Sequence, residues 1–180
     1  MIPSGVLPAI RNMKDFDQVL KSKHEAIVLL ETRLSQLNSI VTYAKKNHKK
    51  VYLHFDLIQG LKADEYGMEF LVREIKPDGI ISTRGNVIGL AKKHKLLAIQ
   101  RMFLLDSIAL ENNLRLIEKS RPDCIEVLPG LIPSVIDQVH TESGLPIVAG
   151  GLIKTEADVI AALDAGAVAV TSSNSDLWEY

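Results

Sequence analysis

Two short stretches near the end of the chain combine small residues in a pattern that can hold a phosphate group. One reads Pro146-Ile-Val-Ala-Gly-Gly151 and the other Ala167-Val-Ala-Val-Thr-Ser-Ser-Asn174, so each is an apolar run followed by small residues. Small residues after a buried strand leave backbone N–H groups uncovered, and a phosphate can approach them closely. The predicted phosphate-binding residues are Gly150, Gly151, Ser172, Ser173 and Asn174. Two ordinary turns rich in glycine and serine are the alternative.

Polar side chains follow most of the other apolar runs as well. If these runs are parallel strands of a barrel, their carboxyl ends meet at one rim, where arginines and carboxylates can surround a small anionic ligand. The predicted members of this ligand-binding rim are Arg11, Glu31, His54, Asp56, Arg84, Gln100 and Glu126. Strand ends that meet water are polar in many proteins, which is the simpler explanation for any one of these residues.

The sequence His54-Phe-Asp56 is the clearest indication of catalysis. Side chains alternate along a strand, so His54 and Asp56 are expected to point the same way and to act as a proton-transfer pair or as two metal ligands. The chain has no HxH or HExxH motif, and no predicted strand carries the lysine of a Schiff-base aldolase in its second half. We therefore predict no catalytic residue, no metal site and no cofactor.

The elements that must position these residues are eight short apolar runs that alternate with amphipathic stretches. The predicted strands are Leu7–Ile10, Ala26–Leu30, Lys50–Phe55, Gly79–Ser82, Leu96–Gln100, Cys124–Leu128, Pro146–Ala149 and Ala167–Thr171. This alternation predicts an α/β fold, a compact TIM-barrel-like (β/α)8 barrel, with an open doubly wound sheet as the alternative. The predicted phosphate-binding residues then follow strands 7 and 8.

The length of the chain predicts an incomplete last unit. It has 180 residues, whereas barrels of this kind usually need about 200 or more. Few residues follow the last predicted strand, so the eighth helix is expected to be truncated. Leu177, Trp178 and Tyr180 are candidates to cover the exposed barrel wall or to contact a second copy of the chain in a homodimer.

Composition predicts one soluble domain over residues 1–180. The chain is 47% hydrophobic, and its 21 basic and 22 acidic residues give a formal charge of −1, so no overall field attracts nucleic acid or membrane. The single cysteine, Cys124, excludes an internal disulfide and suits a reducing cytoplasm. No apolar run approaches the roughly 18 residues of a membrane span. We expect a cytoplasmic protein.

Two lysine clusters contain seven of the 21 basic residues: Lys45, Lys46, Lys49 and Lys50, and Lys92, Lys93 and Lys95. Each cluster ends a predicted helix and precedes a strand, so both lie at the barrel end opposite the ligand-binding rim. Cations at helix C-termini are favoured by the helix dipole without any partner. The alternative is a patch that binds the phosphates of RNA.

Several long blocks resemble the glycerol-3-phosphate-responsive antiterminator family, which regulates bacterial glycerol uptake operons. The blocks are Leu7-Pro-Ala-Ile-Arg-Asn-Met13, His54-Phe-Asp-Leu-Ile-Gln-Gly-Leu-Lys62, Asp64-Glu-Tyr-Gly67, Gly79-Ile-Ile-Ser-Thr-Arg84, Ala98-Ile-Gln-Arg-Met-Phe-Leu-Leu-Asp106, Ile125-Glu-Val-Leu-Pro-Gly130, Ala149-Gly-Gly151 and Ala167-Val-Ala-Val-Thr-Ser-Ser-Asn174. The resemblance extends from about Leu7 to Trp178.

The resemblance implies a βα barrel that binds glycerol 3-phosphate and also binds leader mRNA to prevent early termination. The leading hypothesis is therefore a non-enzymatic, ligand-responsive RNA-binding transcription antiterminator that controls glycerol metabolism genes. Two alternatives stay open. One is an isomerase- or epimerase-like barrel enzyme that acts on a small phosphorylated substrate through His54 and Asp56. The other is a metabolite-binding module that acts through a protein partner.

Overall fold

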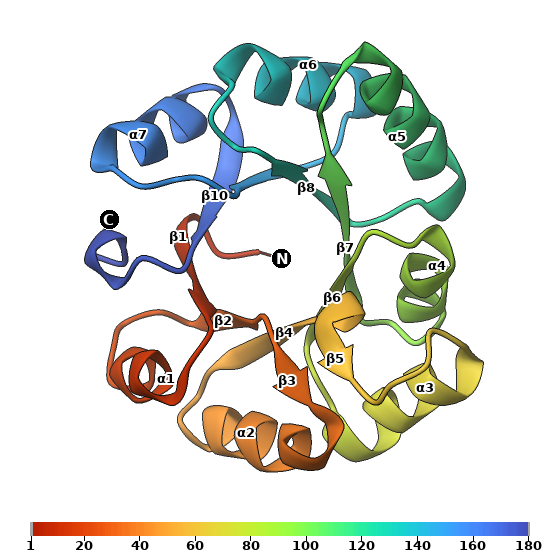
Figure 1. Ribbon diagram of the computed structural model, residues 1–180, viewed down its shortest axis with the longest axis vertical. Helices are drawn as coiled ribbons and strands as arrows, with labels where there is room; N and C mark the ends of the chain where they lie inside the picture. Colours follow the sequence, from red (N-terminus) through yellow and green to blue (C-terminus); the bar gives the residue numbers. More distant parts are fainter. Residues whose placement is uncertain (1, 180) are drawn as a thin grey trace.

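The computed structural model describes residues 2–179, and eight parallel strands close into a barrel (Figure 1). The strands follow one another around the barrel in the order β1-β10-β9-β8-β7-β6-β4-β2. Their bounds are Gly5–Ile10 (β1), Ala26–Leu29 (β2), Lys50–His54 (β4), Gly79–Ser82 (β6), Leu97–Phe103 (β7), Cys124–Leu128 (β8), Ile147–Gly150 (β9) and Ala167–Ser172 (β10). The predicted barrel is confirmed, and the open sheet is wrong.

Seven α-helices surround the barrel in chain order (Figure 1). They are Met13–Leu20 (α1), Leu34–Lys46 (α2), Glu65–Phe70 (α3), Gly85–Lys93 (α4), Ser107–Ser120 (α5), Pro133–Ser143 (α6) and Glu156–Asp164 (α7). A π-helical turn, Leu71–Ile75 (η2), continues α3. The Thr155 side chain accepts from the Asp158 N–H, and Asp158 accepts from the Thr155 N–H, so α7 begins with the expected capping box.

Side chains fill the interior of the barrel, so it is not an open pore. Alternate strand residues point inward, among them Ala9, Tyr52, Ile99, Cys124 and Val148, which pack together as one buried cluster. The other strand residues point outward and pack against the apolar faces of the helices. The layer nearest the carboxyl ends of the strands contains buried polar residues, among them His54, Glu126 and Thr171.

The eighth helix is truncated as predicted. A single 3-10 turn, Ser175–Leu177 (η3), follows β10. Leu177 and Trp178 are 4% and 3% exposed, so they cover the outer wall of the barrel. The Trp178 indole N–H donates to the Ser172 carbonyl at 2.9 Å, and the Trp178 carbonyl lies 2.7 Å from His24 Nε2. Tyr180, the third residue expected there, lies outside the described residues.

Several strand bounds differ from the predicted ones by one to three residues, and the ends of β4 and β7 bear on the site. β4 ends at His54, because a 3-10 turn, Phe55–Leu57 (η1), begins at the next residue. The short strands Thr32–Arg33 (β3) and Ile58–Gln59 (β5) form a two-stranded sheet separate from the barrel. In contrast, β7 continues three residues beyond its predicted end, to Phe103. Within residues 2–179, no helix is both long and apolar enough to cross a membrane.

Alanine substitutions at two glycines are expected to change the free energy of unfolding in opposite directions. A Cβ at Gly79 would lie 2.9 Å from the Leu97 carbonyl oxygen and 2.9 Å from a ring carbon of Tyr52, whereas a Cβ at Gly89 would meet nothing within 4 Å. Gly79→Ala is expected to lower the free energy of unfolding by about 1–3 kcal/mol through overpacking. Gly89→Ala, in the exposed interior of α4, is expected to raise it by about 0.5–1 kcal/mol. Urea denaturation measures both, and equal midpoints for the two variants would contradict this packing.

Candidate functional site

A pocket of about 150 Å³ opens at the carboxyl end of the barrel. Its lining comes from β1, β2, β7, β8 and β10 and from the loops that follow β9 and β10. The pocket is smaller than the roughly 300–1,000 Å³ typical of sites for drug-sized ligands, so its size suits a small metabolite. Five of the predicted site residues line it together: Arg11, Glu126, Gly151, Ser172 and Ser173.

A buried ion pair forms the floor of this pocket. Arg101 Nε donates to Glu126 Oε2 at 2.6 Å, and the hydroxyl of Thr171 donates to Glu126 Oε1 at 2.8 Å. The Glu126 side chain is 1% exposed and that of Arg101 is 12% exposed. Arg101 and Glu126 occupy paired positions on the neighbouring strands β7 and β8, and this register places their side chains next to each other.

Gly150 makes the contact between Glu126 and Thr171 possible. It lies on β9, between the strands that carry the two side chains. A Cβ at this position would lie 2.5 Å from Thr171 Oγ1 and 2.9 Å from Glu126 Oε1. The next residue, Gly151, has φ +72°, a conformation that favours glycine. Both glycines are therefore required by local geometry, whatever ligand the pocket holds.

His54 belongs to the same inner layer, two residues after the inward-pointing Tyr52. It is 3% exposed, and neither ring nitrogen has a hydrogen-bond partner among residues 2–179. Burial lowers the pKa of His54 to about 4, and the positive charge of Arg101 contributes in the same direction. The imidazole is therefore neutral at pH 7. We call His54, Arg101, Glu126 and Thr171 the floor cluster.

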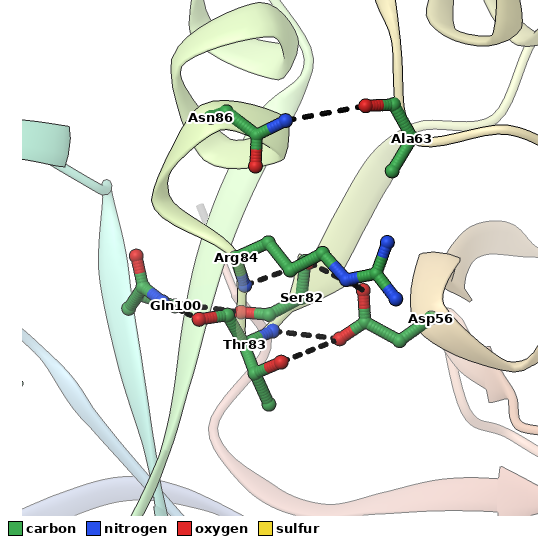
Figure 2. Close-up of polar contacts among 7 residues, drawn as sticks. All are labelled: Asp56, Ala63, Ser82, Thr83, Arg84, Asn86 and Gln100. Carbon is green, nitrogen blue, oxygen red and sulfur yellow. Dashed lines mark hydrogen bonds and ion pairs between the residues drawn. The ribbon is translucent and has the colours of Figure 1, made fainter.

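Asp56 forms no hydrogen bond with His54, and its carboxylate instead faces Ser82, Thr83 and Arg84 (Figure 2). Its Oδ1 accepts from the Ser82 hydroxyl at 2.7 Å, and its Oδ2 accepts from the Thr83 N–H at 2.8 Å and from the Thr83 hydroxyl at 3.0 Å. Arg84 Nε is 3.7 Å from Asp56 Oδ1. Because β4 ends at His54, strand alternation does not extend to Asp56, and its carboxylate instead holds the loop that follows β6. The predicted same-side arrangement of a catalytic pair is wrong.

Seven predicted site residues lie outside the pocket lining: the rim residues Glu31, His54, Asp56, Arg84 and Gln100, and the phosphate-binding residues Gly150 and Asn174. Gln100 points toward α5, where its amide donates to the Thr83 carbonyl at 2.9 Å and accepts from the Ser120 hydroxyl at 3.0 Å. Glu31 lines a separate depression beside α1 and α2. Asn174 caps η3 by accepting from the Asp176 N–H at 3.1 Å. The Gln100, Glu31 and Asn174 side chains thus have other contacts and do not line the pocket.

Sequence reasoning missed Arg101 and Thr171 as site residues. The predicted strand that contains Gln100 ends three residues before β7 does, so Arg101 falls outside it and Gln100 is the predicted site residue. Arg101 is two residues after the inward-pointing Ile99, and Thr171 is two residues after the inward-pointing Ala169. A period of two, extended through the true strand ends, would have identified both.

The two lysine clusters lie at the other end of the barrel, and most of their charges are paired. Lys49 is 7% exposed and donates to the carbonyls of Ser22 and His24, each at 2.6 Å. The ion pairs are Lys45–Asp78, Lys92–Asp123 and Lys93–Glu65. Lys46, Lys50 and Lys95 are exposed and form no ion pair within the described part of the chain. Residues 2–179 contain no group of three or more His, Cys, Asp or Glu side chains placed to bind a metal ion.

The lowered pKa of His54 predicts a pH dependence of stability. Between about pH 4 and 6.5 the unfolded chain binds a proton at His54 and the folded protein does not. The free energy of unfolding should therefore fall as the pH decreases through this window, by up to about 3 kcal/mol. His54→Gln should remove this part of the dependence, whereas His140→Gln, at an exposed position of α6, should keep it. Urea denaturation at pH 7.5 and pH 5 measures the difference, and identical pH dependence in wild type and His54→Gln would refute it.

Comparison with known proteins identifies relatives over nearly the whole chain. The family model described as glycerol-3-phosphate responsive antiterminator matches residues 6–178. The uncharacterized protein YgcP of Escherichia coli (strain K12) is 32% identical over 173 residues, which cover 96% of this chain and 91% of that protein.

Solved structures agree with this match. A glycerol uptake operon antiterminator regulatory protein from Listeria monocytogenes is 49% identical, with a TM-score of 0.95 over 97% of this chain and 95% of that one. A glycerol uptake operon antiterminator-related protein from Thermotoga maritima is 28% identical, with a TM-score of 0.88 over the full length of both chains. The deoxyribose phosphate aldolase of Aeropyrum pernix, 14% identical with a TM-score of 0.72 over 96% of this chain and 86% of that one, shares the fold alone. The chain belongs to the glycerol-3-phosphate responsive antiterminator family.

Proposed function

We propose that this protein is an RNA-binding antiterminator whose pocket at the carboxyl end of the barrel binds glycerol 3-phosphate. The main support for the proposal is the pocket, because it lies at the carboxyl end of the barrel in a member of this family. It combines small residues at the rim with a polar floor, and both are needed for a ligand with a phosphate at one end and hydroxyl groups at the other.

The rim of the pocket suits the phosphate group. Gly151 and Ser173 follow β9 and β10, and Ser172 is the last residue of β10; these are the seventh and eighth strands of the barrel along the chain. Barrels of this type frequently bind phosphate at the loops after these two strands. Arg11, at the end of β1, lines the same side and supplies a guanidinium for a charge-assisted hydrogen bond. The floor cluster then faces the hydroxyl end of the ligand.

A regulator also needs a route from the ligand to the rest of the protein, because a ligand shifts an equilibrium only by binding one state more tightly than another. Ser172 provides such a route. It lines the pocket, and its carbonyl accepts the hydrogen bond of the Trp178 indole. The segment that replaces the eighth helix is therefore anchored to a residue that would contact the phosphate. Trp178 is the single tryptophan of the chain, so its fluorescence reports on this segment.

Substitution at Gly151 tests the phosphate site. Gly151→Asp places a negative charge beside the proposed phosphate position and should abolish binding of glycerol 3-phosphate, measured by calorimetry and by Trp178 fluorescence. Gly151→Ala is the matched control, because it introduces the same strain at positive φ, about 1–2 kcal/mol, without a charge. It should still bind the ligand. Equal affinities of the two folded variants would exclude Gly151 from the phosphate site.

The face that binds RNA can be determined with two sets of lysines. One variant changes Lys46, Lys50 and Lys95 to Gln, which removes exposed charges without an ion pair in the described structure. The other changes Lys14, Lys62 and Lys154 to Gln, three exposed lysines near the pocket end of the barrel. We expect the first variant to weaken leader-RNA binding and to reduce the slope of log affinity against log salt by about 2.

The second variant should bind RNA as the wild type does, at two salt concentrations and with or without saturating glycerol 3-phosphate. If the second variant lost affinity and the first did not, the RNA would bind at the pocket end. If neither affinity nor its ligand dependence could be detected in the wild type, the antiterminator proposal itself would fail.

A further inference from the structure

We propose that Glu126 determines which phosphorylated metabolite the pocket accepts: by neutralising Arg101 at the floor, it admits a polyol phosphate and rejects a phosphorylated carboxylic acid of the same length. This inference rests on the proposed function, because it assumes that the phosphate lies at the rim formed by Gly151, Ser172 and Ser173. It concerns the other end of the ligand.

The charges on the floor are already balanced. The Arg101 guanidinium and the Glu126 carboxylate are 2.6 Å apart, and both side chains are largely removed from water. Thr171 satisfies the second oxygen of Glu126. A ligand carboxylate would have to share a guanidinium that is in use, or lie beside Glu126 without a counter-ion. Both arrangements place like charges together where water cannot screen them, which is strongly unfavourable.

His54 does not supply the missing positive charge. Its ring is buried in the same layer, and its lowered pKa keeps it neutral at pH 7. A neutral imidazole has one N–H donor and one acceptor nitrogen, and neither has a partner among residues 2–179. This combination matches a hydroxyl group, which both donates and accepts. It does not match a carboxylate, which only accepts.

Glu126 also retains capacity to accept a hydrogen bond. A carboxylate has about four lone-pair positions, and the contacts from Arg101 and Thr171 use one on each oxygen. A ligand hydroxyl can donate to a remaining position. The same carboxylate therefore attracts a hydroxyl group and repels an anion, so it selects by attraction and by exclusion at once.

Glu126→Gln should reverse the exclusion. The amide has nearly the same shape, so the floor keeps its volume, but Arg101 loses its counter-ion. A buried guanidinium without an anion is unfavourable, and a ligand carboxylate can then take the place of the Glu126 carboxylate. The variant should consequently gain affinity for a ligand that the wild type rejects.

The test compares glycerol 3-phosphate with 3-phosphoglycerate, which carries a carboxylate in place of the terminal hydroxymethyl group. Binding is measured by calorimetry at pH 7.5 for the wild type, Glu126→Gln and Glu156→Gln. We expect the wild type to prefer glycerol 3-phosphate by about 30-fold or more, since like-charge juxtaposition at a site costs that much or more. In Glu126→Gln this preference should shrink at least about tenfold, chiefly through tighter binding of 3-phosphoglycerate. Glu156→Gln, which removes an exposed charge from the first turn of α7, should keep the wild-type ratio.

Each outcome decides between the inference and the proposed function. Equal affinity of the wild type for both ligands would overturn the inference and leave the proposed function intact, as would an unchanged ratio in folded Glu126→Gln. No binding of glycerol 3-phosphate to the wild type would overturn both. If circular dichroism showed that Glu126→Gln does not fold, the double variant Arg101→Gln with Glu126→Gln, which leaves no unpaired buried charge, replaces it. Its preference must be smaller than that of the wild type, and an unchanged preference would overturn the inference.

Discussion

The buried carboxylate of Glu126 constrains more of this barrel than any other group. A charge at 1% exposure is tolerated only with a counter-ion and satisfied oxygens, and three strands contribute to that requirement. β7 supplies Arg101 in register with Glu126, β10 supplies Thr171, and β9 between them carries Gly150, which has no side chain to obstruct the contact. The strand lengths and the register on this side of the barrel are those that bring the three groups together.

A second carboxylate, that of Asp56, organises the opposite side of the barrel mouth, the carboxyl end where the pocket opens. The two sides differ in whether their polar groups are already hydrogen-bonded to the protein. Both carboxylate oxygens of Asp56 accept hydrogen bonds from Ser82 and Thr83, and Gln100 links the Thr83 carbonyl to α5. These bonds tie the loops to one another and leave no group directed at a ligand. The pocket above Glu126, in contrast, lies at the β7–β10 side and extends to β1 and β2. His54, on β4 in the barrel interior, has no hydrogen-bond partner within residues 2–179. One half of the mouth is therefore a rigid support, and the other half is the part available for binding.

The sequence predicts the architecture far better than it predicts the individual site residues. Eight apolar runs are enough to indicate the barrel, because that signal is local. Gly151, Ser172 and Ser173 line the pocket, and their phosphate-binding role stays a prediction. Gln100 and Arg101 show what is lost. Ending the predicted strand at Gln100 leaves out Arg101, which continues the inward alternation of Ile99, and the true end of the strand is set by pairing with β8, which lies far away along the chain. Lys49 is buried although the sequence predicts it in an exposed lysine cluster. The reason is again distant in the chain, because the carbonyls that accept from its ammonium belong to the segment before β2.

Closure of the barrel joins the two ends of the chain, and this has a consequence for the order of folding. Gly5 of β1 pairs with Ala169 of β10, and His24 meets the Trp178 carbonyl. Such distant pairings are slow to form and cannot form before the last residues have been synthesised. During synthesis on the ribosome, one edge of β1 therefore stays unpaired until β10 has been made.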